Sequence, residues 1–390
     1  MKTTKTRALA TALATAVAGW VLTASPAAAI TFTALGDLLG GDFSSTAYAI
    51  SNDGSTVVGT SSALVDFEAF RWTTGTGMLP LADLAGGGGE GAAYGVSGDG
   101  SLIAGYGTVT GGTGTEAASW SAPLYLPTDL GNLGGANPFS IANGVSGDGS
   151  VIVGETTTPA GLEAFLWTSG GGMIALDDFA GGPTSSTAAA VSDDGSVIVG
   201  RGSHFGPLSE AFRWTSGAGL EGLGDLAGGI DESRANGVSG DGATVVGDSR
   251  SASGIEAFVW TAGSGMEGLG DLAGGDFESR AHDASGDGNA IVGYGTTVDG
   301  QRATIWNATG QIFDLNGIAA AVLPAGWVLE EAFGVSADGL SIVGRGSNAD
   351  GNNEAFLLTI DFVPVPEPRT ALLVALGLVA TAGARRRRAE

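Results

Sequence analysis

The feature that most constrains the fold is an internal repeat. A Ser-x-Asp-Gly tetrapeptide occurs seven times between residues 51 and 339, at intervals of 46, 49, 46, 47, 46 and 51 residues. A period of this length means that each repeat is one supersecondary unit that buries its apolar face against its neighbours. The seven glycines are Gly54, Gly100, Gly149, Gly195, Gly242, Gly288 and Gly339.

Each repeat contains four short apolar runs. In the fifth repeat these are Ala235–Ser239, Ala243–Gly247, Glu256–Trp260 and Met266–Leu272, the last of which ends in Leu-Gly-Asp-Leu. The runs are rich in β-branched and aromatic residues and are bounded by Gly, Asp and Ser, a pattern typical of strands rather than helices. Asp-Gly pairs supply the positive φ that tight hairpins need. The sequence therefore predicts four antiparallel strands per repeat.

Four strands in each unit of 46 to 51 residues indicate a β-propeller blade. We therefore predict an all-β fold, a seven-bladed β-propeller spanning residues 30–363. The segment Thr31–Leu38 precedes the first repeat and carries Leu-Gly-Asp-Leu, whereas the last repeat has no such segment after Glu354–Ile360. The N-terminal strand is expected to complete the last blade and close the ring. The alternative is an open β-solenoid.

Two further positions recur in almost every repeat. A Trp position is expected to pack in the core, and an acidic position four residues before it is expected to make structural hydrogen bonds. The tryptophans are Trp72, Trp120, Trp167, Trp214, Trp260 and Trp306, with Leu358 in the seventh repeat, and the acids are Glu68, Glu116, Glu163, Glu210, Glu256 and Glu354.

The N-terminal 29 residues have the pattern of a secretory signal peptide. Lys2, Lys5 and Arg7 precede the apolar stretch Ala8–Leu22, and small residues follow at the predicted cleavage site, Ala27 to Ala29. The mature protein would begin near Ile30 outside the cytoplasm. The alternative is an N-terminal membrane anchor.

The C-terminal residues 364–390 combine three signals. A Pro-Glu-Pro tripeptide precedes an apolar segment, Ala371–Ala384, that is short for a membrane span of roughly 20 residues, and an Arg cluster then favours the cytoplasmic face. The signals are Pro366, Glu367 and Pro368, followed after the apolar segment by Arg385, Arg386, Arg387 and Arg388.

This order resembles the PEP-CTERM sorting signal. The resemblance implies a Gram-negative-type envelope, transient anchoring in the inner membrane by a transmembrane helix, and removal of the segment by an exosortase-like membrane protease. It also implies export to the cell surface or medium and an association with extracellular polysaccharide. The alternative is a simple C-terminal membrane tail.

The body of the chain also resembles a known repeat family. Its Glu-Ala-Phe-x-Trp, Leu-Gly-Asp-Leu and Gly-Val-Ser-x-Asp-Gly-Ser segments are similar to the HAF repeats of bacterial extracellular proteins. The resemblance implies an extracellular role and no chemistry that could be assigned to residues here. The second repeat departs most, with Ala117-Ala118-Ser119-Trp120 and Leu130-Gly131-Asn132-Leu133.

Charge and composition exclude several classes of function. Eight of the 16 positive residues lie in the two ends, and 39 of the 41 acids lie between them, so residues 30–366 carry a net charge of −31 with eight Arg and no Lys. Such a surface repels nucleic acid, and a phosphate-binding loop would need a Lys. The chain has no Cys, which excludes disulfides, thiolate metal sites and cysteine nucleophiles.

Candidate ligand-binding residues come from one variable repeat position. His282 occupies a position in the innermost predicted strand whose chemistry differs from repeat to repeat, so this position could line a ligand site near one face of the ring. The alternative is a hydrogen-bonded His inside the blade stack. The position holds Tyr48, Tyr94, Asn143, Ala189, Asn236, His282 and Phe333.

The only metal predicted is Ca²⁺, at an oxygen-rich segment of the last repeat, for which a plain hairpin loop is the alternative. The turn aspartates could also bind cations weakly as a ring. The other histidine, His204, lies in an inter-strand loop without an assigned role, and no catalytic residue or other cofactor is predicted. The proposed Ca²⁺ ligands are Asn348, Asp350, Asn352 and Glu354.

The sequence therefore predicts an exported, non-enzymatic interaction or matrix protein of the cell surface or medium. It would bind polysaccharide or another envelope protein through the loops Ser61–Phe67, Thr108–Thr115 and Gly202–Ser209. It would contact the membrane only through its C-terminal segment before processing. One alternative is a propeller hydrolase or lyase acting on polysaccharide, and another is a purely structural surface protein, since fold alone does not define function.

Overall fold

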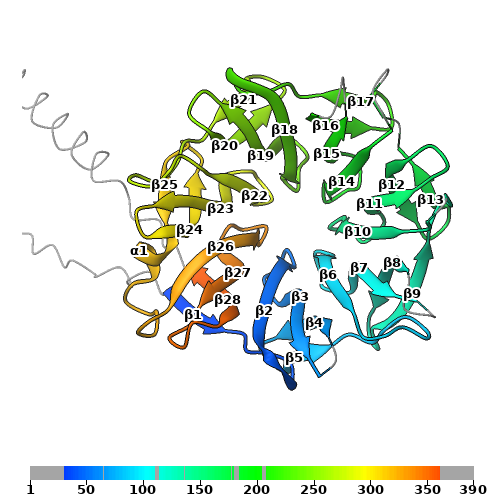
Figure 1. The fold of residues 1–390 in the computed structure, drawn as a ribbon, viewed down its shortest axis with the longest axis horizontal. Coiled ribbons are helices and arrows are strands. Elements are labelled where there is room, and N and C mark those ends of the chain that lie inside the picture. Colours follow the sequence, from blue (N-terminus) through cyan, green and yellow to red (C-terminus); the bar gives the residue numbers. More distant parts are fainter. Residues whose placement is uncertain are drawn as a thin grey trace, which may run out of the picture. The chain divides into compact units, whose positions relative to one another are not determined.

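A computed structural model describes residues 30–64, 66–109, 114–135, 137–176, 178–179, 184–203 and 208–360. Within these ranges 28 strands form seven four-stranded antiparallel sheets, arranged as the blades of a closed ring (Figure 1). The predicted seven-bladed β-propeller is confirmed, and the open solenoid is excluded because the first blade packs directly on the last. The propeller is one compact unit, Ile30–Asp361.

The blades are numbered in chain order. Blade 1 contains β2 (Gly40–Ile50), β3 (Thr56–Ala63), β4 (Phe67–Thr73) and β5 (Gly77–Pro80); blade 2 contains β6 (Gly91–Val96), β7 (Leu102–Thr108), β8 (Thr115–Ser121) and β9 (Leu126–Gly131). Blade 3 contains β10 (Ser140–Val145), β11 (Ile152–Thr157), β12 (Leu162–Thr168) and β13 (Gly172–Ala175); blade 4 contains β14 (Ser186–Val191), β15 (Ile198–Ser203), β16 (Ser209–Thr215) and β17 (Gly219–Gly222). Blade 5 contains β18 (Gly228–Val238), β19 (Thr244–Ser251), β20 (Ile255–Thr261) and β21 (Gly265–Gly268); blade 6 contains β22 (Arg280–Ala284), β23 (Ala290–Thr297), β24 (Gly300–Asn307) and β25 (Ile312–Asp314), followed by the helix α1 (Leu315–Ala319). Blade 7 contains β26 (Val328–Val335), β27 (Ser341–Ser347), β28 (Asn353–Ile360) and β1 (Ile30–Ala34).

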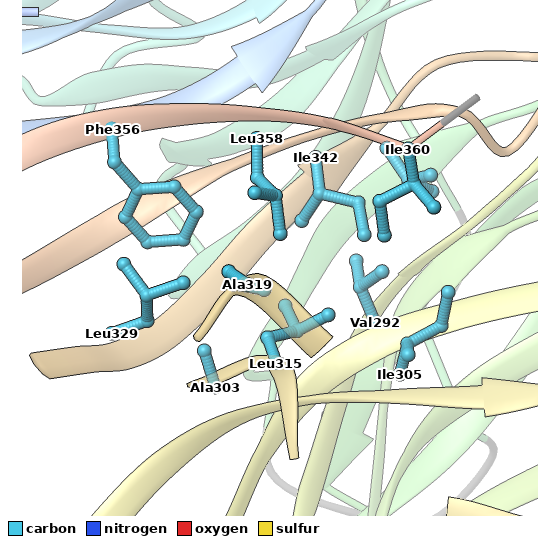
Figure 2. Close-up of a cluster of buried hydrophobic side chains, with 12 residues drawn as sticks. Val292, Ala303, Ile305, Leu315, Ala319, Leu329, Ile342, Phe356, Leu358 and Ile360 are labelled. Carbon is cyan, nitrogen blue, oxygen red and sulfur yellow. The ribbon is translucent and has the colours of Figure 1, made fainter. Parts of the chain in front are cut away.

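The hydrophobic core consists of layers between neighbouring blades. Alternate residues of the second and third strands point to opposite faces of each blade, so both faces are apolar and each packs on the next blade. Figure 2 shows the layer between blades 6 and 7, where Leu315 and Ala319 of α1 pack near Leu329, Phe356 and Leu358. The repeated Trp position lies in these layers, as predicted, and is fully buried at Trp306.

The N-terminal strand closes the ring as predicted. β1 pairs antiparallel with β28, from Ile30 opposite Ile360 to Ala34 opposite Phe356. Phe32 also meets Trp327 edge to face, with ring centroids 4.9 Å apart. The last blade is thus built from both ends of the propeller, and the termini of this unit are held together by a strand pair.

The Leu-Gly-Asp-Leu segments, which we expected to end the fourth strand, are loops. The outer strands are short, and β1 ends at Ala34, before Leu35. Gly36 has a φ of 74°, which breaks the strand and turns the chain, while Leu35 and Leu38 are buried against the next blade. The apolar residues of this segment therefore serve the layer between blades rather than a strand pair.

The Ser-x-Asp-Gly segments form the turns between first and second strands. In blade 1, Ser51 Oγ donates to Asp53 Oδ1 at 2.6 Å, and the same oxygen accepts the N–H of Ser55 at 2.9 Å. All seven turns have both hydrogen bonds, which satisfy the aspartates within the turn. The repeated aspartates are turn residues, as predicted.

A serine that the sequence analysis did not single out joins neighbouring blades. Ser233 Oγ donates to the carbonyl of Gly224 at 2.7 Å and accepts the N–H of Ala211 at 2.9 Å. The glycine belongs to the loop after β17 and the alanine to β16, so one buried hydroxyl connects blades 4 and 5. The bond to the alanine N–H recurs at four other interfaces, at Ser45, Ser140, Ser186 and Ser279.

Among the described residues, no helix is long and apolar enough to cross a membrane. The predicted cleavage residues Ala27 and Ala29 and the sorting residues from Pro366 to Arg388 lie outside the described ranges, so both targeting segments stay predictions.

Candidate functional site

One end of the central channel is closed by a ring of backbone hydrogen bonds. Each Ser-x-Asp-Gly turn donates an N–H to the carbonyl of residue x in the next blade, and the seventh bond returns to blade 1. The bonds run from Asp53 to Gly98 (3.4 Å), Gly98 to Gly147 (2.9 Å), Asp148 to Asp193 (2.9 Å), Asp193 to Gly240 (3.0 Å), Asp241 to Gly286 (3.1 Å), Gly286 to Ala337 (3.0 Å) and Ala337 to Asn52 (3.2 Å).

Two side chains fill the centre of this ring. Asn52 Nδ2 donates to Asp193 Oδ1 at 2.9 Å, although 141 residues separate them in the chain. Asp193 occupies space that glycines leave free, because a Cβ on Gly147 would lie 2.2 Å from its Oδ1 and one on Gly240 would lie 2.3 Å from its Oδ2. We call the ring together with Asn52 and Asp193 the floor.

Above the floor lies a cavity of about 350 Å³. Figure 1 shows the innermost strands that surround it. Its wall is formed by the innermost strands β2, β6, β10, β14, β18, β22 and β26. Because the strands are antiparallel and the Ser-x-Asp-Gly turns lie at the floor, the loops between second and third strands lie on the opposite face. We call this cavity the pit.

All seven residues of the variable repeat position line the pit. The periodicity predicted that equivalent residues of the innermost strands would meet near the channel, and the structure brings them together there. They are Tyr48, Tyr94, Asn143, Ala189, Asn236, His282 and Phe333. Their arrangement is thus established, and their binding of a ligand stays a prediction.

Four of these residues form an arc of rings on one side of the pit. The ring centroids are 5.0 Å apart between Tyr94 and Tyr48, 5.4 Å between Tyr48 and Phe333, and 5.1 Å between Phe333 and His282. We call them the aromatic arc. Burial raises the pKa of the Tyr48 and Tyr94 hydroxyls above the ordinary value, so both remain neutral hydrogen-bonding groups at physiological pH.

The amides on the other side of the pit are anchored to the next blade. Asn143 Nδ2 donates to the carbonyl of Ala188 at 2.9 Å, and Asn236 Nδ2 donates to the carbonyl of Ala281 at 3.0 Å. Asn236 Nδ2 also donates to Asp248 Oδ1 at 3.1 Å, and together these bonds fix the planes of both amides. The amide oxygens are left as acceptors for a ligand.

His282 has a partner in the neighbouring blade. Its Nε2 lies 2.9 Å from Glu331 Oε1, and Glu331 Oε2 accepts a hydrogen bond from Arg345 Nε at 3.0 Å. Burial acts to raise the pKa of Glu331, but the hydrogen bond and charge from His282 and the charge of Arg345 hold this pKa below its ordinary value. His282 therefore lines the pit and also makes a hydrogen bond between blades. The two alternatives that the sequence left open, a residue lining the channel and a hydrogen-bonded histidine in the blade stack, thus both describe its position.

Two carboxylates of the pit, Asp193 and Asp283, were missed by the sequence analysis. Asp283 Oδ1 accepts the N–H of Ala284 at 2.8 Å, and its Oδ2 accepts the N–H of Val335 in the next blade at 3.0 Å. Burial raises the pKa of Asp283 to about 6, against the opposing effect of these hydrogen bonds.

Both aspartates depart from the repeat, and this departure is the signal that could have found them. Other blades have mostly glycine in place of Asp193, as at Gly98, and only glycine or alanine in place of Asp283. The equivalents of Asp283 are Ala49, Gly95, Gly144, Ala190, Gly237 and Gly334.

The segment proposed to bind Ca²⁺ is the hairpin between β27 and β28. Asn348 Oδ1 accepts the N–H groups of Asp350 and Asn352, and Asn348 Nδ2 donates to Glu354 Oε2 at 3.0 Å. Side chains of the segment thus stabilise the turn itself. No group of three or more His, Asp or Glu in the described part of the chain is arranged to hold a metal ion, and Ca²⁺ binding stays a prediction.

The three loops proposed to bind a partner join second and third strands, so they lie on the face opposite the floor. Parts of them, including His204 and residues 110–113, lie outside the described ranges.

The repeated glutamate position, four residues before the repeated tryptophan, makes the structural hydrogen bonds that we expected. Glu256 Oε1, for example, accepts the N–H of Gly270 in the loop after β21 at 3.2 Å.

Neither a protein-family model nor a curated protein matches this chain. Solved structures do match it. An oligogalacturonate lyase in complex with manganese is 12% identical, with a TM-score of 0.52 over 85% of this chain and 90% of that one. A prolyl endopeptidase is 10% identical, with a TM-score of 0.52 over 84% of this chain and 52% of that one.

TolB from Acinetobacter baumannii is 14% identical, with a TM-score of 0.45 over 69% of this chain, which spans 62% of that protein's length. At these identities the similarities show the fold alone. The chain is a seven-bladed β-propeller whose central pit is closed at one end by the floor.

Proposed function

We propose that this protein is an exported propeller that binds an extracellular polysaccharide in the pit. The observation that carries the proposal is the pairing of the aromatic arc with anchored amides across one cavity. Sugars present apolar C–H faces and hydroxyl groups together, and a pit with aromatic rings and fixed polar groups offers partners for both. The proposal moves the predicted binding site from the loops to the pit that lies below them.

The shape of the pit limits what part of a polysaccharide could enter it. Its volume of about 350 Å³ lies near the lower end of the range for small-molecule sites, roughly 300–1,000 Å³. The floor prevents a chain from threading through the ring. The pit would therefore hold a chain end or a side branch, while the surrounding loops would contact the rest of the chain.

Replacing Tyr94 by alanine should weaken polysaccharide binding about tenfold, because the arc loses the ring at one of its ends. Blade 4 already has Ala189 at this position, so the fold accepts the smaller side chain. The measurement is isothermal titration calorimetry with purified exopolysaccharide of the producing organism. The matched control is Ile174→Ala on the outer strand β13, where Ile174 is exposed.

Equal affinity of the Tyr94→Ala and wild-type proteins would place the binding surface outside the pit. New reducing ends in the titrated sample would indicate a polysaccharide hydrolase, and unsaturated products would indicate a polysaccharide lyase. Either result would replace the proposal that the protein only binds polysaccharide.

We further propose that the chain reaches the cell surface or medium through the N-terminal signal peptide and the C-terminal PEP-CTERM-like segment. Mass spectrometry of the native protein from separated cell and medium fractions should find a start near Ile30 and an end near Pro366. An intact cluster from Arg385 to Arg388 in a membrane fraction would contradict processing by an exosortase-like protease and would make the protein a tethered envelope component.

A further inference from the structure

We infer that the unit bound in the pit is an amino sugar, whose protonated amine lies between the carboxylates of Asp193 and Asp283 and the aromatic arc. This inference rests on the proposed function and specifies its substrate class. A polysaccharide that contains 2-amino-2-deoxyhexose residues with free amines would supply such a unit.

The pit is lined by two carboxylates and by His282, whose Nε2 is already engaged by Glu331 at 2.9 Å. Asp193 and Asp283 are its carboxylates, and no Arg or Lys is among the lining residues that the structure describes. Higher on the wall, Arg280 pairs with Asp248 at 3.3 Å and Arg345 pairs with Glu331 at 3.0 Å, so these arginines are already neutralised. Among the described residues, neither Asp193 nor Asp283 has an ion-pair partner.

The other side of the same cavity suits a cation. Aromatic faces attract ammonium groups through their quadrupole, most strongly where water is excluded. Tyr48, Tyr94 and Phe333 supply the phenyl and phenol rings of the arc, with neighbouring centroids 5.0 and 5.4 Å apart. Asp193 on the floor, Asp283 on the wall and the rings of the arc together form a site for an organic cation, in which the sugar ring could also use the anchored amides.

Other sugar classes fit this pit less well. A uronic acid or a sulfated sugar would bring a second negative charge beside two unpaired carboxylates. A neutral sugar would cover both carboxylates without a counter-charge, which is unfavourable because the charged form loses water. The net charge of −31 on residues 30–366 also raises the local concentration of cationic chains around the propeller.

Burial raises the pKa of Asp283 to about 6, and the backbone hydrogen bonds from Val335 and Ala284 and the charge of His282 oppose this shift only in part. Like-charge repulsion from Asp193 adds a smaller contribution that also raises the pKa of Asp283. A bound ammonium group would relieve this repulsion and lower the pKa.

The test compares three β-1,4-linked tetrasaccharides by calorimetry at pH 7, built from glucosamine, N-acetylglucosamine or glucose. The mature propeller should bind the glucosamine compound at least tenfold more tightly than the other two, and added salt should reduce this preference. Equal affinities for the three compounds would overturn the inference and leave the proposed function standing. No binding of the glucosamine compound would also overturn it, while the titration with native exopolysaccharide decides the proposed function separately.

The double variant Asp193→Asn, Asp283→Asn removes both charges and should abolish the preference for the amine. The variant Asp193→Gly, Asp283→Gly restores the residues of the other blades and serves as a second form if the first one folds poorly. The matched control is Glu221→Gln, Glu267→Gln on the outer strands β17 and β21, which makes the same change in charge far from the pit. A preference that survives both pit variants would overturn the inference, as would Ca²⁺ binding to the wild-type pit in place of the amine.

Discussion

Deletion of residues 30–34 is expected to unfold the propeller. The deletion removes β1, leaves the outer edge of β28 unpaired, and exposes Leu358 and Ile360, which are buried in the intact ring. The lost backbone pairing and the apolar burial of Phe32 together contribute on the order of 5 kcal/mol or more. Because native proteins are stable by about 5–15 kcal/mol, the loss should be visible by circular dichroism and in urea denaturation at 25 °C.

A circular permutant is the control for this deletion, because it keeps residues 30–34 paired with β28 but attaches them to the C-terminal end of the propeller. It would begin at Leu39, run to Ile360, and continue through an Asn-Gly turn into residues 30–38. Ile30 lies opposite Ile360, so a two-residue hairpin can join them. The permutant should keep most of the wild-type free energy of unfolding. If the deletion variant were as stable as the wild type, the strand pair would not be what holds the ring closed.

The architecture could be predicted because the same pattern of strands and turns occurs in all seven repeats of the sequence. Equivalent positions in successive units must occupy equivalent positions in space, so a periodic pattern places Tyr48 and His282 at the same level of a ring without any knowledge of contacts. The last repeat lacks a fourth strand segment after Ile360, and an extra segment precedes the first repeat at Thr31. Together these two observations predict that the N-terminal strand closes the ring. The Leu-Gly-Asp-Leu segment was misassigned because its leucines are buried as strand residues are, although the positive φ of Gly36 removes it from the strand.

The chemistry of the pit was harder to predict from the sequence, because it depends on residues that differ from the repeat pattern. The hydrogen bond from Asn52 to Asp193 crosses the channel between blades 1 and 4, and no local pattern predicts a pair 141 residues apart. Asp283 stands where most blades have glycine, and its burial follows from the approach of Val335 in the next blade. A repeat protein conserves its scaffold internally, so positions where one unit differs are where a site can form, and comparing the units would have shown both aspartates.

The titration of Asp283 gives the second large prediction, a loss of stability as pH rises from about 4 to 6. Its pKa is about 6 in the folded protein and 3.8 as the ordinary value, so the folded state binds the proton more tightly. The unfolded state therefore holds fewer protons in this window, and the free energy of unfolding falls as pH rises through it. The expected change is on the order of 3 kcal/mol, and it is complete above the folded pKa.

Other carboxyls titrate in the same scan, so the difference between two proteins is the informative quantity. Burial also raises the pKa of Asp37 and Asp178, whereas the pKa of Glu331 is lowered, and its contribution is lost only as pH falls below the ordinary value of 4.5. Asp283→Gly and Asp283→Asn each remove one titration and also lose hydrogen bonds, but that loss shifts the whole curve equally at every pH.

The free energy of unfolding of either variant relative to wild type, from urea denaturation, should therefore rise by about 3 kcal/mol between pH 4 and pH 7. The two variants should differ from each other by a constant. Parallel curves for wild type and variant would mean that Asp283 is as well solvated in the pit as in the unfolded chain. In that case burial would impose no penalty on the charged form of Asp283, and the argument that this carboxylate needs a bound amine as its counter-charge would fail.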